Sequence, residues 1–139
     1  MNIRAEQASD TTEIDALTQA AFLNASHTSH TEHLIVGALR AANALTVSLV
    51  ATEAGRIVGH VAVSPVSISS GAAHWYGLGP VSVLPEMQGL GIGSRLITAA
   101  LAQLQTLSAH GCVVLGEPEY YQRFGFKAEP SLVLADVPA

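Results

Sequence analysis

The 139-residue sequence predicts an α/β domain in which a mixed, mostly antiparallel twisted sheet is flanked by helices. Strand-like and helix-like periodicities alternate along the chain. Three strand-like segments between residues 46 and 83 are separated by short turns, which favours an antiparallel meander. A helical pattern over residues 91–110 then leads to the apolar run 112–115. A crossover through a helix makes the strands on either side of it parallel.

Composition excludes several classes of protein. Apolar residues make up 49% of the chain and charged residues 12%, whereas disordered chains are poor in apolar residues. The net charge of −5 comes without a basic stripe, so we expect no nucleic-acid partner. No apolar run approaches the ~20 residues of a membrane-spanning helix, so we expect no membrane partner. The single cysteine, Cys112, cannot form an intrachain disulfide, which favours the cytoplasm.

Two amphipathic helices are expected in the first third of the chain. Asp10 and Glu13 have the spacing of a capping box, with Asp10 as the N-cap. Ser29 and Glu32 repeat this spacing before a second apolar stripe. Asn43 then suits the left-handed residue that ends a helix.

Four strands are expected around these helices. A short edge strand covers residues 2–4, and the meander covers 46–52, 57–68 and 75–83. Pro65 lies inside the second strand of the meander. Because proline has no N–H to donate to a ladder, this strand is predicted to lie at an edge or to carry a bulge.

The last third of the chain predicts a helix, a strand, a short helix and a strand. The helix over 91–110 ends before Gly111, and the run 112–115 reads as a fully buried strand. Residues 118–125 suit a short helix, and 132–135 suit a final strand.

A glycine-rich segment carries the chemical signal. Residues 81–94 read Val-Ser-Val-Leu-Pro-Glu-Met-Gln-Gly-Leu-Gly-Ile-Gly-Ser, a strand followed by a turn and the start of a helix. A helix start offers unpaired N–H groups and partial positive charge, and glycines let a bulky anion approach the backbone. The lysine of a P-loop is missing, and the glycine spacing differs from that of a dinucleotide fold. The segment does satisfy a third pattern, Gln/Arg-x-x-Gly-x-Gly/Ala, through Gln88, Gly91 and Gly93.

With this motif the chain resembles the GNAT superfamily of acetyl-CoA-dependent N-acetyltransferases. The resemblance covers nearly the whole chain, and the order of the predicted elements matches. Residues 120–126, Tyr-Tyr-Gln-Arg-Phe-Gly-Phe, look like the family's aromatic-Gly-Phe helix end. Together with residues 58–66, Val-Gly-His-Val-Ala-Val-Ser-Pro-Val, the segment 116–126 is similar to a poorly characterised bacterial subgroup of predicted acetyltransferases.

The resemblance implies where acetyl-CoA is held as the co-substrate. The pantetheine arm pairs with the main chain of 81–83, in a gap between two parallel strands that splay apart. Gly77, Gly79 and Pro80 favour that gap because they weaken ladder pairing. An N–H near Val83 then faces the thioester oxygen. The implied binding residues, which include the turn that cradles the pyrophosphate, are Val81, Ser82, Val83, Gln88, Gly89, Leu90, Gly91, Ile92, Gly93 and Ser94.

The resemblance also implies a catalytic acid, Tyr121, four residues before Gly125, which protonates the departing thiolate. A general base is harder to assign. The carboxylate that some family members place on the strand before the turn is missing from residues 74–83. His60 and His74 are alternatives, but a structural role explains each of them better. A water chain or an amine that arrives neutral needs no residue at all.

Three other features have plain structural interpretations. His27, His30 and His33 recur every third residue, but this spacing turns around a helix by ~120°, so we expect no metal site. Cys112 reads as a strand residue rather than a nucleophile. Arg95 suits either a cofactor phosphate or solvent.

We therefore expect one acetyltransferase domain over residues 1–139, which transfers an acetyl group directly to a primary amine in a ternary complex. The acceptor is a small molecule or a peptide. The family's usual last strand has no clear counterpart. Either this sheet edge is open, or a partner chain fills it, or the sequence has been shortened; because an exposed edge invites pairing, a homodimer is favoured. The alternative hypothesis is a non-catalytic acyl-CoA-binding or regulatory module.

Overall fold

The computed structural model of the chain describes residues 1–23, 31–67, 71, 73–114 and 121–126. Its elements, in chain order, are β1 (Asn2–Ala5), the 3-10 turn η1 (Ala8–Asp10), α1 (Thr11–Phe22), α2 (Glu32–Ala41), β2 (Val47–Glu53), β3 (Arg56–Pro65), β4 (Trp75–Val83), the 3-10 turn η2 (Pro85–Met87), α3 (Ile92–Thr106) and β5 (Gly111–Val114).

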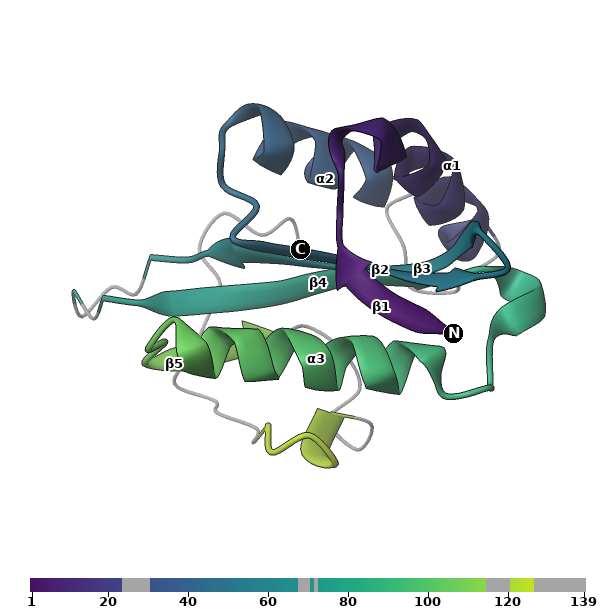
Figure 1. Ribbon diagram of the computed structural model, residues 1–139. Helices are drawn as coiled ribbons and strands as arrows, with labels where there is room; N and C mark the ends of the chain where they lie inside the picture. The colour runs from purple at the N-terminus through teal and green to yellow at the C-terminus, as the bar shows by residue number, and fades with distance from the viewer. Residues whose placement is uncertain (24–30, 68–70, 72, 115–120, 127–139) are drawn as a thin grey trace.

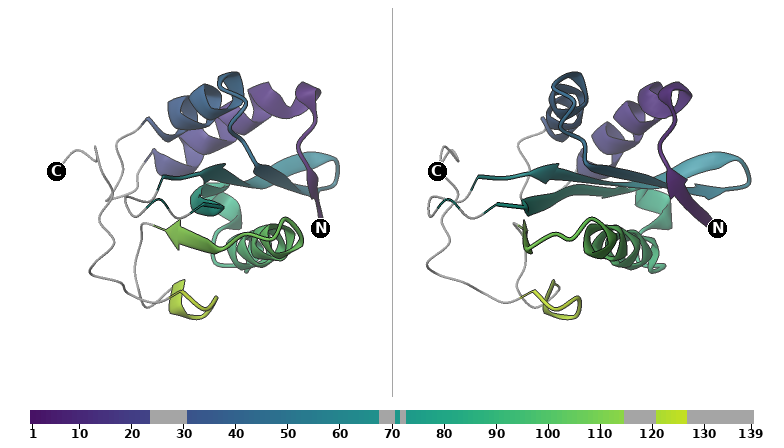
Figure 2. Two further views of the ribbon diagram at one scale, coloured as in Figure 1. Left: turned by 90° about the vertical axis from the view of Figure 1, so that its left-hand side faces the viewer. Right: turned by 60° about the vertical axis from the view of Figure 1, so that its left-hand side comes forward.

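The strands form one five-stranded sheet in the order β1-β2-β3-β4-β5. Successive strands from β1 to β4 pair antiparallel, and β4 pairs parallel with β5. Helices α1 and α2 cover one face and α3 covers the other (Figure 1), and the turned views of Figure 2 show these three layers from the side. The predicted α/β class, with its mixed and mostly antiparallel sheet, is confirmed.

Each face of the sheet carries its own apolar cluster. Leu96, Ile97 and Ala100 of α3 are fully buried against one face. On that face Gly59 lets α3 come close, because a Cβ there would lie 2.9 Å from Cδ1 of Leu96. The opposite face is closed by Ile14, Leu17, Val36, Val50 and Ile57.

Asp10 is the N-cap of α1, as predicted, but its side chain makes no capping hydrogen bond to this helix, and the predicted capping box with Glu13 is wrong because both acids have other partners. Asp10 accepts a hydrogen bond from the N–H of Gln7 at 2.7 Å and pairs with Arg4 at 2.7 Å. Glu13 accepts from the N–H of Ile57 at 2.7 Å. These carboxylates therefore attach α1 to the segment after β1 and to β3.

The second helix begins later than predicted. α2 starts at Glu32 with Thr31 as its N-cap, and Ser29 lies outside the described residues. The predicted left-handed end is confirmed, since Asn43 has a φ of 59°.

The strand predicted over residues 57–68 is too long, and its edge position is wrong. β3 is the middle strand of the sheet, and Pro65 is its last residue. A proline ends a central ladder because it has no N–H to donate. β3 does carry the predicted bulge, because its register with β2 shifts between Ile57 and Gly59, where β3 has one extra residue.

The predicted end of the long helix is also wrong. α3 stops at Thr106, and Ser108 takes a φ of 59°, which turns the chain toward β5. β5 is half-buried rather than fully buried. Gly125 has a φ of 93°, as the predicted end of the short helix requires, whereas Pro118 and residues 132–135 lie outside the described part of the chain.

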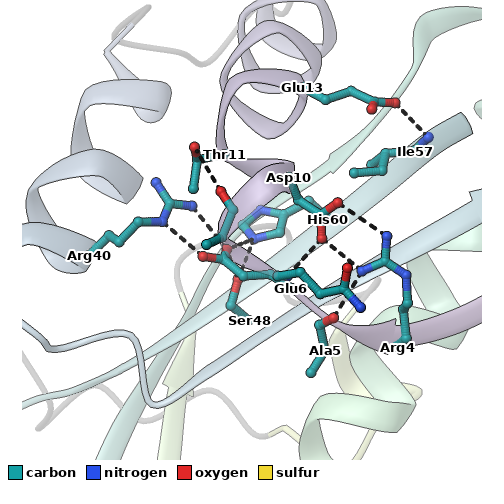
Figure 3. Close-up of polar contacts among 12 residues, drawn as sticks. Arg4, Ala5, Glu6, Asp10, Thr11, Glu13, Arg40, Ser48, Ile57 and His60 are labelled. Carbon is teal, nitrogen blue, oxygen red and sulfur yellow. Dashed lines mark hydrogen bonds and ion pairs between the residues drawn. The ribbon is translucent and has the colours of Figure 1, made fainter.

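A chain of polar side chains, made of Arg40, Glu6, Ser48 and His60, runs between the sheet and the helical layer of α1 and α2 (Figure 3). Nε and Nη2 of Arg40 donate to the Glu6 carboxylate at 2.8 and 2.9 Å. Ser48 donates to the same carboxylate, and its Oγ lies 2.8 Å from Nε2 of His60. Burial lowers the pKa of His60 from 6.5 to about 4, so the ring is neutral at neutral pH.

The contact between Gly59 and α3 predicts the effect of one added methyl group. In Gly59→Ala the new Cβ would meet Leu96 at 2.9 Å and Ile92 at 3.0 Å, so we expect a loss of about 1–3 kcal/mol in the free energy of unfolding. Gly37→Ala in α2 is the matched control, since nothing lies within 4 Å of that Cβ, and a gain of up to about 1 kcal/mol is expected. Urea denaturation measures both, and equal midpoints would contradict the close packing.

The lowered pKa of His60 predicts how stability depends on pH. Between pH 6.5 and about 4 the unfolded chain binds a proton at His60 that the folded chain does not bind. We therefore expect stability to fall as the pH is lowered through this window, by up to about 3 kcal/mol. The hydrogen bonds from Arg40 lower the pKa of Glu6 from its ordinary 4.5, so protonation of Glu6 lowers stability at a lower pH than this window. Urea denaturation across the window should show a flatter pH dependence in His60→Gln, and an identical slope in both proteins would refute the assignment.

Candidate active site

β4 changes direction halfway along its length. Val63 pairs with Leu78 and Val61 pairs with Val81, so β4 has one more residue than β3 between these two pairs. The extra residue makes a bulge at Gly79–Pro80, where Gly79 has a φ of 135°, a value that L side chains rarely adopt. Leu78 also belongs to the last described pair of the parallel ladder with β5.

Beyond the bulge, the backbone groups of β4 alternate between two edges. The N–H of Leu84 donates to the carbonyl of Val58 at 3.0 Å, so it points toward β3. Hydrogen-bonding direction alternates along a strand, so the backbone N–H of Ser82 also points toward β3. The N–H groups of Val81 and Val83 point toward the opposite edge of β4. On that edge Nε2 of Gln88 donates to the carbonyl of Val83 at 3.1 Å.

A cavity of about 440 Å³ lies at this outer edge. It is bounded by the end of α1, by β4 beyond the bulge and by the start of α3. The described lining residues are Ala20, Ala21, Phe22, Val81, Val83, Pro85, Gln88, Gly93, Ile97 and Tyr121.

The glycine turn adjoins this cavity and leads into α3. Gly89 and Gly91 have φ values of 82° and 84°, so the turn itself requires glycine at both positions. A Cβ on either would meet no atom of the described residues within 4 Å. The N–H of Arg95 donates to the carbonyl of Gly91 at 3.1 Å, as the first such bond of α3. The preceding N–H groups of the first turn have no partner inside the helix.

A second cavity, of about 420 Å³, lies over this turn. It shares Val83, Gln88 and Gly93 with the first cavity, so the two form one continuous lining. The described residues around it are Val83, Gln88, Gly89, Gly91, Ile92, Gly93, Ser94 and Arg123.

The structure brings together most of the residues predicted to hold the co-substrate. All of them except Ser82 and Leu90 line one or both cavities. Ser82 is 1% exposed and its backbone faces β3, whereas Leu90 is 67% exposed at the outside of the turn.

Tyr121 lies in the lining of the first cavity, beside β4 and α3. Its ring packs at 6.4 Å from the ring of Phe124 and at 5.9 Å from that of Phe126. All three rings pack against the core cluster beneath α3. The aromatic motif therefore anchors this short segment and holds Tyr121 at the cavity.

Arg123 is a site residue that the sequence analysis missed. It lines the cavity over the glycine turn, and Arg95, which was considered for a phosphate, does not. The signal was available, because Arg123 lies within the aromatic motif of residues 120–126. What the sequence did not contain was the return of this segment to the start of α3.

The candidate bases do not reach the described cavity lining. His60 on β3 is 0% exposed, and its ring is neutral at neutral pH because burial lowers its pKa to about 4. His74 lies exposed before β4, with its ring 5.2 Å from that of His110. Burial raises the pKa of Cys112 to about 11, so its thiol is protonated and is a poor nucleophile.

The described residues contain no group of three or more potential metal ligands, and His27 and His30 fall outside them. Within the same residues, no helix is long and apolar enough to cross a membrane.

Comparison with known proteins identifies the family. A family model described as "Acetyltransferase (GNAT) domain" matches residues 44–128, from just before β2 to just past the aromatic motif. The chain is 36% identical to the uncharacterized N-acetyltransferase YhbS of Escherichia coli K12, over 91% of this chain and 74% of that protein.

Two solved structures are similar over most of the chain. A GNAT family acetyltransferase from Brucella melitensis, in complex with acetyl-CoA, is 55% identical with a TM-score of 0.89, over 91% of this chain and 82% of that one. The Escherichia coli YhbS structure, in complex with CoA, is 35% identical with a TM-score of 0.82, over 91% and 68% respectively. The match to the family model and the identity to these relatives show that the chain is an acetyltransferase and belongs to the GNAT family.

Proposed function

We propose that this protein transfers the acetyl group of acetyl-CoA to a primary amine, with both substrates bound together. The observation that carries the proposal is the outer edge of β4. The N–H groups of Val81 and Val83 point to a cavity that also contains Tyr121 and adjoins the glycine turn. The relatives solved with acetyl-CoA and with CoA support a thioester co-substrate of this kind.

The residues that line the two cavities suit the parts of acetyl-CoA. The diphosphate would lie on the N–H groups at the start of α3, where helix geometry leaves donors and partial positive charge. Arg123 would add a full positive charge above the same turn. The amide groups of the pantetheine arm would pair with Val81 and Val83, as a neighbouring strand does.

The chemistry follows from this placement. The thioester supplies an activated acetyl group, and the N–H of Val83 would stabilise the negative charge that develops on its oxygen. Tyr121 would give its phenolic proton to the departing sulfur, since a tyrosine hydroxyl is a donor at neutral pH. The acyl group passes directly to the amine, so no covalent enzyme intermediate forms.

The amine would enter beside the end of α1, where Ala20–Phe22 line the first cavity. None of the described lining residues is an aspartate or a glutamate. We propose that water takes the proton of the amine, or that the amine binds neutral. A small molecule or a peptide remains the expected acceptor. A single domain over residues 1–139, cytoplasmic location and a homodimer stay predictions.

Thiol release tests the proposed function. Acetyl-CoA is incubated with the protein and a panel of polyamines, amino acids, aminoglycosides and peptide N-termini. Amine-dependent release of CoA supports the proposal. Tight binding of CoA without release for any amine would favour the non-catalytic module instead.

Tyr121→Phe tests the catalytic acid. Loss of the hydroxyl should lower kcat by about 100-fold or more, because a positioned acid contributes about 10²–10⁴-fold to a rate. The KM for acetyl-CoA should stay within about twofold, since the ring and its packing remain. Tyr76→Phe on β4, outside both described linings, is the matched control and should leave kcat unchanged. Equal kcat values in all three proteins would exclude the acid role.

Arg123→Gln tests the charge above the glycine turn. Removing it should raise the Kd for CoA by about three- to tenfold, the range between an exposed ion pair and a charged hydrogen bond. Arg95→Gln removes an equal charge three residues into α3, outside the described lining, and should change the Kd less than about twofold. Calorimetry measures both variants, and equal effects would mean that Arg123 acts only through net charge.

A further inference from the structure

Two buried polar atoms belong to a pair of residues on the adjacent strands β3 and β4. Among the described residues, Nδ1 of His60 and Oγ of Ser82 have no hydrogen-bond partner, and the two residues are 0% and 1% exposed. They are directly opposite each other in the register of β3 and β4. Residues paired in this way point their side chains to the same face of a sheet. Since buried polar groups are rarely left unpaired, this juxtaposition calls for an explanation.

The polar chain determines which proton the His60 ring carries. Ser48 donates its only hydroxyl proton to Glu6, so its oxygen must accept from Nε2 of His60 at 2.8 Å. The neutral ring therefore carries its proton on Nε2 and has a bare lone pair on Nδ1. Arg40 holds the Glu6 carboxylate at the far end of the chain.

Ser82 supplies the missing donor. Its hydroxyl has no hydrogen-bond partner in the part of the chain that the structure describes. The buried hydroxyl of Thr18 on α1 does not compete for Nδ1, because it donates to the carbonyl of Ile14 at 2.8 Å. A donor without an acceptor thus lies opposite an acceptor without a donor, on paired residues of adjacent strands.

We propose that Ser82 and His60 are linked by a hydrogen bond to Nδ1, either directly after a change of the χ1 rotamer that moves Oγ of Ser82 or through one buried water, and that this link positions β4 for acetyl transfer. Both are positioning residues, because neither lines the described cavities. This inference rests on the proposed function, since it concerns the same edge of β4.

The role follows from where Ser82 lies in the strand. Its neighbours Val81 and Val83 present their N–H groups at the cavity edge, just beyond the bulge. A side-chain link on the sheet face under α1 and α2 restrains rotation of residues 81–83. The link is continuous with Ser48, Glu6 and Arg40, so it attaches β4 to β2 and α2. The N–H of Val83 is thereby held toward the place proposed for the thioester oxygen.

The ring nitrogens of His60 provide a test that needs no substrate. In ¹⁵N NMR at neutral pH, with the resonances assigned by their loss in His60→Gln, we expect the Nε2-protonated tautomer and a hydrogen-bonded Nδ1. Ser82→Ala should move the Nδ1 resonance to that of an unbonded nitrogen, and Ser64→Ala on β3 should not. The opposite tautomer, or an Nδ1 resonance unchanged in Ser82→Ala, would overturn the link. The wild-type spectrum decides the tautomer even where Ser82→Ala fails to fold.

Calorimetry with acetyl-CoA and with CoA then tests the positioning role. Ser82→Ala should weaken acetyl-CoA by about three- to tenfold, as expected for one hydrogen bond, while CoA changes less than about twofold. Ser82→Thr, which keeps the hydroxyl, should bind acetyl-CoA with the Kd of the wild-type protein. Equal weakening of both ligands, or of neither, would refute positioning. Failure of wild-type protein to bind acetyl-CoA would instead count against the proposed function, which the ring spectrum does not test.

Discussion

The proposed site depends on one constraint, which is that β4 must stay paired on one edge while its other edge is left for a ligand. Backbone N–H and carbonyl groups require partners, so a strand presents such an edge only where something else can pair with it. The bulge at Gly79–Pro80 falls where the described parallel ladder with β5 ends. Beyond the bulge, the N–H groups of Val81 and Val83 point toward the cavity, whereas those of Ser82 and Leu84 point toward β3.

The neighbouring elements follow from this constraint. Gln88 donates to the carbonyl of Val83, so the N–H of Val83 is the backbone group that remains for a ligand at that edge. The positive φ values of Gly89 and Gly91 turn the chain so that α3 begins beside the strand. The tight turn and the proposed binding of the diphosphate thus depend on the same glycines. The sheet face under α1 and α2 carries the polar side chains of Ser48, His60 and Ser82 beside its apolar cluster.

The sequence predicts β4 with its observed bounds and the start of α3 to within one residue, because strand periodicity and glycine signals there are local. It does not predict the end of α3, since Ser108 is no stronger a stop than His110 by composition. The partners of Asp10 and the approach of Arg123 to the glycine turn depend on contacts between distant segments, as does the neutral state of His60. These features arise only once the chain has folded.

Amide hydrogen exchange along β4, with and without acetyl-CoA, tests the central claim most directly. The account predicts fast exchange at Val81 and Val83 in the free protein, slow exchange at both once acetyl-CoA is bound, and slow exchange at Ser82 and Leu84 throughout. Protection of Val81 and Val83 without any ligand, or no gain in protection on binding acetyl-CoA, would contradict it.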